Sequence, residues 1–316
     1  MSEIAIRGAT PEDVPGILTV LKSALGETPL LKRTAELFSW KHYDNPFGPS
    51  IVLVATSDVG DIVGVRALMR WDLKTPDLQT VRCLRAVDTA TAPDFQGQGI
   101  FSRLTNTAVD IAKKDGIHLI FNTPNAKSAG GYLKMGWVEV GWVKPLVRPR
   151  LGRTLGVNHG AIPDLTDALP IASAFATAGH SDRPPQGLRT PRDDRYNRWR
   201  FECHPTARYG WVRGEKRGGA IVRASVRGRY PELIVSDLYD PEDETALALT
   251  LARHRTRYVA AAFTGGPELS LAREVGLRHF PRVNGLRLVA NVLTDIDIDV
   301  TRLASWDLAM SDLELL

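Results

Sequence analysis

A glycine-rich loop connects a predicted strand to a predicted helix in the first third of the sequence. The loop reads Gln96-Gly97-Gln98-Gly99, and the helix begins at Ile100. The first N–H groups of a helix have no partner within the helix and lie at the positive end of its dipole. Glycines let an anion approach the backbone closely. The loop therefore predicts a pyrophosphate site, with the Gln96 amide as a further donor. A plain strand-to-helix turn is the alternative.

A second motif follows the next predicted strand, where Asn125, Tyr132 and Gly136 are spaced by seven and four residues. Together the two motifs resemble the GCN5-related N-acetyltransferase (GNAT) superfamily. That family has Gln/Arg-x-x-Gly-x-Gly/Ala after its fourth strand and the Asn, Tyr and Gly after its fifth. The resemblance covers Glu3–Val147. It departs at Phe101, where the family has Gly or Ala, so this side chain must turn away from a diphosphate or pack below it.

The resemblance implies that acetyl-CoA is the co-substrate and lies where two central strands separate. It implies donor contacts from Thr89, Ala90, Thr91, Gln96, Gly97, Gln98, Gly99, Ile100, Phe101, Asn125 and Ser128. The backbone of residues 89–91 would bind the pantetheine arm, and Asn125 would lie near its cysteamine end. Tyr132 would protonate the departing thiolate as a general acid. The alternative is that Tyr132 is only a core aromatic residue.

The general base is a separate question, because an attacking amine must be neutral and must lose a proton. Asp88 lies midway along the strand that leads into the loop. A carboxylate in a half-buried strand is expected to have a raised pKa suited to this task. Asp88 could instead bond a neighbouring strand or loop. His42, Asp44 and a water chain without a dedicated base are further alternatives.

Elements that would position these residues follow from apolar periodicity and turn signals. Helices are predicted from Thr10 to Leu21 and at 34–43, 100–114 and 125–134. Strands are predicted at 3–7, 51–55, 62–69, 81–92, 117–122 and 138–147. This order predicts an α/β fold with a mixed central sheet flanked by helices, as the resemblance also implies.

The remainder of the chain repeats features of the first part. We expect a catalytic domain at 1–147, a linker at 148–160 and a second GNAT-like domain at 161–316. Trp40–Pro46 is echoed by Trp199–Pro205, and each precedes a predicted hairpin. The repetition predicts a tandem duplication.

The second copy is predicted to be inactive. Acidic residues at 240, 242 and 243 stand where the glycine loop would be, and they would repel a pyrophosphate. Ala272 takes the place of Tyr132. Such a copy would act as a scaffold, as one wall of the acceptor cleft or as a dimer surface, so a homodimer is a further possibility.

Composition limits the remaining classes. The 316 residues carry a net charge of +4, are 43% hydrophobic and include two cysteines, Cys83 and Cys203. Few cysteines favour a reducing compartment, and we find no secretion signal and no apolar run of about 18 residues. We therefore expect a soluble, cytoplasmic protein without metal. The Arg-rich region at 148–229 is interpreted as a solvated surface, so a nucleic-acid partner is not expected.

These observations lead to one functional hypothesis and two alternatives. The first is transfer of an acetyl group from acetyl-CoA to a primary amine of a small molecule, for example an amino sugar or a natural product. One alternative is a longer-chain acyl-CoA N-acyltransferase. The other is a non-catalytic acyl-CoA-binding sensor, which would tolerate the loss of Tyr132.

Overall fold

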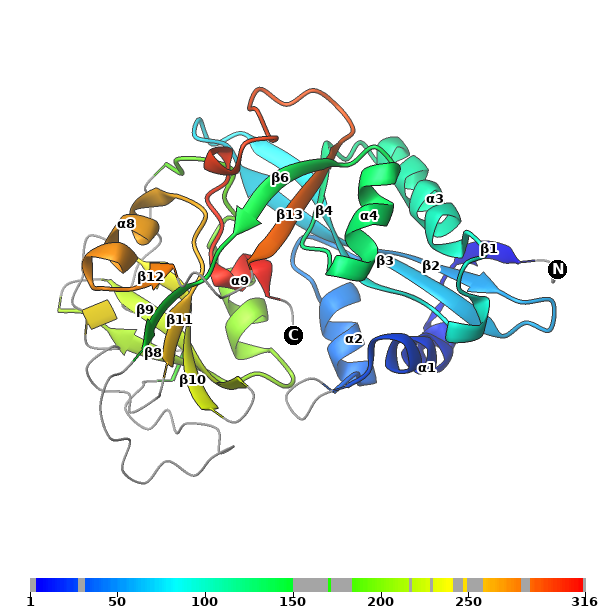
Figure 1. Cartoon of the computed structure of the whole chain (residues 1–316), viewed down its shortest axis with the longest axis horizontal. Helices are drawn as coiled ribbons and strands as arrows, with labels where there is room; N and C mark the ends of the chain where they lie inside the picture. The colour runs from blue at the N-terminus through cyan, green and yellow to red at the C-terminus, as the bar shows by residue number, and fades with distance from the viewer. Residues whose placement is uncertain are drawn as a thin grey trace. The chain divides into compact units, whose positions relative to one another are not determined.

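The protein is described by a computed structural model (Figure 1). It describes residues 4–27, 32–149, 170–171, 184–215, 218–227, 230–240, 247–248, 258–279 and 285–314. These residues form two compact units. The first unit contains the described residues up to Leu73, Thr80–Val140 and Leu288–Thr301. The second contains Lys74–Gln79 and the described residues of Gly141–Arg287 and from Arg302 onward.

The first sheet has seven strands in the order β1-β2-β3-β4-β5-β13-β6. They are β1 (Ala5–Gly8), β2 (Ile51–Thr56), β3 (Ile62–Lys74), β4 (Thr80–Thr91), β5 (Leu119–Asn122), β13 (Leu286–Val292) and β6 (Val138–Val143). β1 pairs with β2 and β2 with β3 in antiparallel fashion, whereas β4 and β5 are parallel. The expected mixed sheet is confirmed.

Helices cover both faces of this sheet (Figure 1). They are α1 (Val14–Leu25), α2 (Ala35–His42), α3 (Ile100–Lys114) and α4 (Ala126–Lys134). Successive side chains of a strand point to opposite faces. Val54 of β2 accordingly packs with Ile17 of α1 and Phe38 of α2, whereas Leu53 packs in another cluster with Leu104 of α3. The strands are apolar on both sides because each side has its own helical layer.

Most predicted elements of the first unit are present with small shifts at their ends, but the single strand expected at 138–147 is wrong. The chain there forms two strands, Val138–Val143 in the first sheet and Leu146–Pro149 in the second. The helix over 100–114 begins and ends at the expected residues. A 3₁₀ turn (Pro11–Asp13) precedes α1, which continues to Leu25. The strand expected at 62–69 extends to Lys74.

A strand from near the end of the sequence completes the first sheet. β13 lies between β5 and β6 and pairs with β5 in antiparallel fashion, with Val289 opposite Asn122 and Val292 opposite Leu119. Leu288, Val289 and Ala290 are fully buried. The sequence predicted a single boundary near residue 147, but this pairing joins distant segments and could not be seen from local patterns.

The second sheet has six strands in the order β12-β7-β11-β10-β9-β8. They are β12 (Arg278–His279), β7 (Leu146–Pro149), β11 (Tyr258–Ala261), β10 (Tyr230–Tyr239), β9 (Gly219–Arg227) and β8 (Tyr209–Arg213). β10 and β11 are parallel, and β7 is antiparallel to both β11 and β12.

The two sheets thus share a pattern in which a strand from elsewhere in the chain lies beside the parallel pair. β13 has this position in the first sheet and β7 has it in the second. The shared order supports the hypothesis of two copies, which stays a prediction. The expected linker beyond residue 149 lies outside the described residues.

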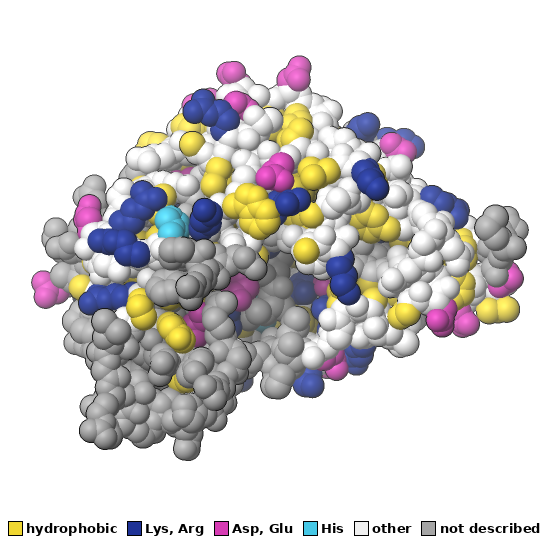
Figure 2. Space-filling view, viewed as in Figure 1, with side chains coloured by type: hydrophobic (Ala, Val, Ile, Leu, Met, Phe, Trp, Pro, Cys, Tyr) yellow, Lys and Arg dark blue, Asp and Glu magenta, His cyan; other side chains and the backbone are white. Residues whose placement is uncertain are grey.

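Further elements of the second unit are α6 (Asp194–Asn197), α8 (Gly266–Glu274), α9 (Met310–Leu313) and the short turns η3 (Arg198–Glu202) and η4 (Leu303–Ser305). In the described part of the chain, no helix combines the length and the hydropathy needed to cross a membrane. On the face shown in Figure 2, Lys and Arg side chains are interspersed with acidic and apolar ones.

The position of β13 predicts that residues 1–147 do not fold by themselves. A fragment with this range leaves one edge of β5 unpaired and loses Leu288 and Val289 from its core. Burial of each such side chain contributes roughly 1.5–3 kcal/mol. We expect no cooperative urea transition in circular dichroism for the fragment alone. The same fragment with residues 285–301 attached through a flexible linker should regain one, and equal transitions for both would contradict the prediction.

Candidate active site

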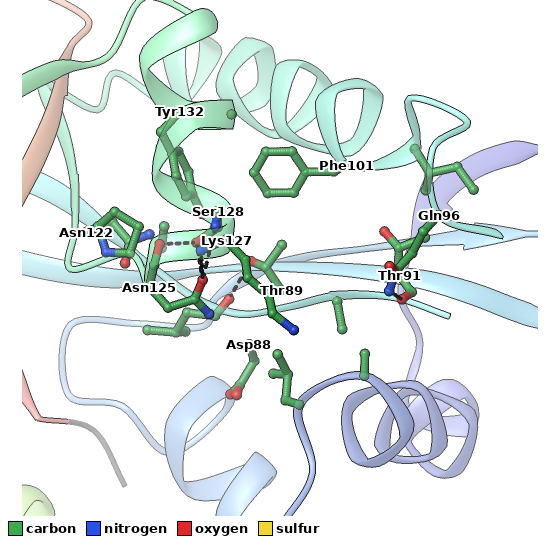
Figure 3. A pocket seen from close by; sticks show the side chains of 18 of the residues that line it. Asp88, Thr89, Thr91, Gln96, Phe101, Asn122, Asn125, Lys127, Ser128 and Tyr132 are labelled. Carbon is green, nitrogen blue, oxygen red and sulfur yellow. Dashed lines mark hydrogen bonds between the residues drawn. The ribbon is translucent and has the colours of Figure 1, made fainter. Parts of the chain in front are cut away.

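The pairing of β4 with β5 ends partway along β4. Its register joins Cys83 to Leu119 and stops where Arg85 faces Phe121. Beyond that point, residues 86–91 of β4, the last residue of β5 (Asn122) and residues 123–125 border a cavity of about 500 Å³ (Figure 3). Backbone groups released from strand pairing need other partners. An extended ligand could supply them by lying against β4 like an added strand.

The cavity brings together most of the residues predicted from the sequence. Those that line it are Asp88, Thr89, Ala90, Thr91, Gln96, Gly97, Gly99, Ile100, Phe101, Asn125, Ser128 and Tyr132. Gln98 is not among the lining residues. The glycine loop, the end of β4 and the second motif therefore border the same cavity and form one site.

The loop is shaped by two glycines and closed by one side chain. Gly97 and Gly99 have φ angles of +77° and +73°, a region that other residues rarely adopt. Gly99 is the N-cap of α3, so the first N–H groups of that helix are available to an anion. Gln96 Nε2 donates a hydrogen bond to the Thr91 carbonyl at 3.1 Å and fastens the loop to the end of β4.

Phe101 packs inward beside the tyrosine (Figure 3). Its ring meets that of Tyr132 edge to face, with centroids 5.4 Å apart. A Cβ on Gly131 would lie 2.9 Å from the Phe101 ring, so the absence of a side chain on α4 makes room for it. The departure from the family pattern thus places an aromatic ring in the cavity wall next to Tyr132.

Asn125 caps α4. Its Oδ1 accepts hydrogen bonds from the backbone N–H groups of Lys127 and Ser128, each at 3.0 Å. Ser128 Oγ lies 3.2 Å from the same oxygen. These contacts occupy Oδ1, so the Asn125 side chain has its Nδ2 group to offer a ligand.

Tyr132 lies on α4 with its ring buried between Phe101 and Trp137. Its hydroxyl accepts a hydrogen bond of 2.5 Å from Nη1 of Arg66, a fully buried residue of β3. The same Nη1 donates to Thr89 Oγ1 at 2.8 Å. The predicted acid thus belongs to a network that spans β3, β4 and α4.

A kink at Asp88 decides which side chains of β4 face that network. Asp88 has a φ of +36°, which is strained for a residue with a side chain. Leu84 and Ala86 pack in the core cluster that contains Tyr132. Strict alternation would direct Asp88 the same way, but Thr89 contacts Arg66 instead. Asp88 points toward α2 (Figure 3).

The Asp88 carboxylate is bound by three basic side chains. Lys41 Nζ and His42 Nε2 each lie 3.1 Å from Oδ2, and Arg33 Nη1 lies 3.4 Å from Oδ1. Burial alone would raise the pKa of Asp88. The charge of Lys41, the hydrogen bond from His42 and the charge of Arg33 outweigh burial and hold this pKa well below its usual range. The raised pKa expected from the sequence is wrong, because these partners come from a distant segment.

The other two candidate bases lie away from the cavity. Burial lowers the pKa of His42, and Asp88 opposes this only in part. The neutral ring can donate from Nε2 to Asp88 and accept at Nδ1 from Ser50, 2.9 Å away. Asp44 is exposed and lies 3.3 Å from the Ser39 hydroxyl.

Sequence reasoning missed several residues of the site. Lys127, Asn122 and Leu25 line the cavity, and Arg66 lies behind Tyr132. Lys127 and Asn122 adjoin the recognised motif, so proximity could have indicated them. A signal for Arg66 was a lone charge within an otherwise apolar predicted strand at 62–69.

The corresponding opening of the second unit is filled by the chain itself. The β10–β11 pairing ends where Val235 faces Ala261. Beyond it, Thr264 N–H donates to the Leu308 carbonyl at 3.0 Å, and Phe263 forms a bridge with Ala309. Ala272 of α8 is buried. In the described residues, the segment 306–312 therefore lies where the first unit has its cavity.

Comparison with known proteins finds a similarity to one family in the first part of the chain. Residues 5–140 match the family model for the acetyltransferase (GNAT) domain. No curated protein sequence is significantly similar to the chain.

Solved structures resemble the chain over most of its length, at identities that establish the fold alone. A probable N-acyltransferase from Enterococcus faecalis has a TM-score of 0.64 at 11% identity, over 92% of this chain and 73% of that one. A GCN5-related N-acetyltransferase from Anabaena variabilis has a TM-score of 0.62 at 13% identity, over 92% and 73%. One from Kribbella flavida has a TM-score of 0.61 at 13% identity, over 92% and 71%.

The Asp88 cluster predicts a loss of stability in Asp88→Asn. The substitution leaves Lys41 and Arg33 buried without their counter-charge, which costs about 3–5 kcal/mol in comparable pairs. The pKa of Asp88 is depressed in the folded state. The ionised carboxylate therefore makes its full contribution to the free energy of unfolding above the pKa of an unfolded aspartate, about 3.9, and this contribution is lost progressively as the pH falls below that value. In urea unfolding, the difference in free energy of unfolding between Asp88→Asn and the wild type should be constant near pH 7 and should become smaller below pH 4.

Asp94→Asn is the matched control, since Asp94 is exposed just beyond β4. A free energy of unfolding for Asp88→Asn equal to that of this control would contradict the prediction.

Proposed function

We propose that the first unit, whose residues 5–140 match the family model for the acetyltransferase (GNAT) domain, transfers an acetyl group from acetyl-CoA to a primary amine of a small molecule. The observation that carries the proposal is the cavity itself. One wall is the part of β4 that has left β5, one end is the glycine loop, and Tyr132 lies in the opposite wall. This arrangement suits a ligand with an anionic end, an amide-containing arm and a reactive end.

The residues present fit the acyl donor. The N–H groups at the start of α3 would hold the diphosphate, with Lys127 available for a further phosphate contact. Backbone groups of Thr89–Thr91 would pair with the amides of the pantetheine arm. Asn125 Nδ2 would donate to the arm near its thiol end. Phe101 packs against Tyr132 and leaves the path along the loop open, so the departure from the family pattern is compatible with binding.

In the proposed reaction, the amine nitrogen attacks the thioester carbonyl carbon, a C–N bond forms and the C–S bond breaks. Tyr132 gives its hydroxyl proton to the leaving thiolate and regains a proton from solvent. The nitrogen releases one proton to water. Burial of the Tyr132 ring holds the hydroxyl at a fixed place in the cavity wall.

We assign no protein base to the amine. Asp88 lines the cavity, but its carboxylate is engaged by Lys41, His42 and Arg33, and a carboxylate with a depressed pKa accepts protons poorly. A water chain is the simplest acceptor for the released proton. The pH dependence of turnover would then follow the deprotonation of the free amine.

We further propose that the second unit is an inactive copy with a structural role. Its opening holds residues 306–312, and an alanine occupies the tyrosine position. One acyl-donor site per chain is the expected stoichiometry in a titration with acetyl-CoA.

The assignment of Tyr132 predicts the behaviour of Tyr132→Phe. Loss of a general acid should lower kcat by about 10²- to 10⁴-fold, while the affinity for acetyl-CoA stays within about twofold. Thiol release should be followed with acetyl-CoA, butyryl-CoA and a panel of ethanolamine, putrescine, glucosamine and kanamycin. Unchanged turnover in the variant would refute the general-acid role. Faster turnover with butyryl-CoA would favour the longer-chain alternative, and no turnover with any pair would favour the sensor.

The assignment of the loop predicts the behaviour of Gly99→Glu. The new carboxylate would oppose a diphosphate at the start of α3, so the Kd for acetyl-CoA in calorimetry should rise at least tenfold. Gly60→Glu is a matched control, because Gly60 is also exposed, has a φ of +89° and has open space at its Cβ. Equal affinities for the two variants would refute the loop as the diphosphate site.

A further inference from the structure

Arg66 is a buried charge that no carboxylate neutralises in the described residues. Its side chain is fully buried on β3, and its Nε and Nη2 atoms have no hydrogen-bond partner there. Only Nη1 is engaged, by the Tyr132 hydroxyl at 2.5 Å and by Thr89 Oγ1 at 2.8 Å. The guanidinium carbon lies 5.2 Å from the Tyr132 ring centroid.

Such a charge is costly to bury without a counter-ion. The second unit shows the usual solution, because its buried Arg192 contacts Asp237 and Asp312 at 2.7 Å each. Arg66 has two oxygens of uncharged side chains instead. The buried guanidinium would be stabilised most in a state in which one of those two oxygens carries a negative charge.

We propose that Arg66 positions Tyr132 as the proton donor and stabilises the negative charge that forms on the phenol oxygen when its proton passes to the leaving thiolate. The proposal rests on the acetyltransferase function proposed above. Bonds and protons are accounted for as in the acyl transfer described above. The C–S bond breaks and the sulfur takes the Tyr132 hydroxyl proton. The phenolate then stays beside the guanidinium until solvent returns a proton.

The direction of the hydrogen bond supports this role. A guanidinium carries only donors, so the phenol oxygen must accept from Arg66. The phenol hydrogen is then free to point elsewhere, and Tyr132 borders the cavity. Arg66 thereby excludes the opposite orientation, in which the Tyr132 hydroxyl would accept a hydrogen bond from the ligand and donate its own hydrogen toward the core.

Thr89 holds Arg66 in place. Its Oγ1 accepts from Arg66 Nη1 and donates to the Val87 carbonyl at 3.0 Å. This contact depends on the kink at Asp88, which turns Thr89 toward β3. The Thr89 hydroxyl therefore links the strained backbone at Asp88 to Arg66, and through Arg66 to Tyr132.

The test is a double-mutant cycle on the full chain, with acetyl-CoA and the panel amine that gives the fastest turnover. Arg66→Met should lower kcat about 10- to 100-fold with little change in the Kd for acetyl-CoA. Arg66→Lys should restore part of the loss, and Thr89→Val should give a smaller loss of the same kind. In the Tyr132→Phe background, Arg66→Met should change kcat by less than about twofold, because the charge it stabilises no longer forms.

Arg70→Met on the same strand controls for the substitution, since Arg70 pairs with Asp115 near the surface. Thermal unfolding checks that each variant is folded. If Arg66→Met lowers kcat equally in both backgrounds, Arg66 is merely structural and the proposal is wrong; an unchanged kcat also overturns it. Full turnover in Tyr132→Phe alone would instead refute the general acid itself, so the two failures can be told apart.

Discussion

The separation of β4 from β5 after Arg85 and Phe121 is the constraint on which the site depends. Parallel strands normally satisfy each other's backbone groups, and a sheet that opens in its middle leaves them without partners. The opening persists because β4 bends away at Asp88, whose left-handed backbone is stabilised by contacts with α2 and Arg33. The loop, the cap of α4 and the tyrosine then border one space.

Two groups of buried cations have opposite electrostatic balance in the first unit. Arg33 and Lys41 surround a carboxylate that stays ionised, so their charges stabilise the fold. In the part of the chain that the structure describes, Arg66 has two hydroxyl groups and no carboxylate as hydrogen-bond partners, so its positive charge next to Tyr132 is not neutralised there. The first group contacts β4 at its kink, and Arg66 lies where we propose that the reaction takes place.

Local patterns were sufficient to predict the motifs and most elements of the first unit, but not β13. The loop was visible because it is made by backbone geometry and neighbouring residues, whereas Asn125 was visible only as part of a motif and its role as a helix cap was not predicted. The orientation of Asp88 was not visible, because a single kink reverses the alternation that periodicity assumes. Its depressed pKa depends on residues 46 to 55 positions away. Arg66 was missed for a similar reason, since its contact with Tyr132 joins residues 66 positions apart.

The place of β13 also sets an order in time. Residues 286–292 are translated after every other strand of both sheets, and they are needed between β5 and β6. A nascent chain on the ribosome therefore contains the glycine loop and Tyr132 long before the sheet around them can close. Until then one edge of β5 is open to wrong partners. Chains that terminate early would carry the site's residues without its fold, so quality control during synthesis bears directly on how much working protein a cell obtains.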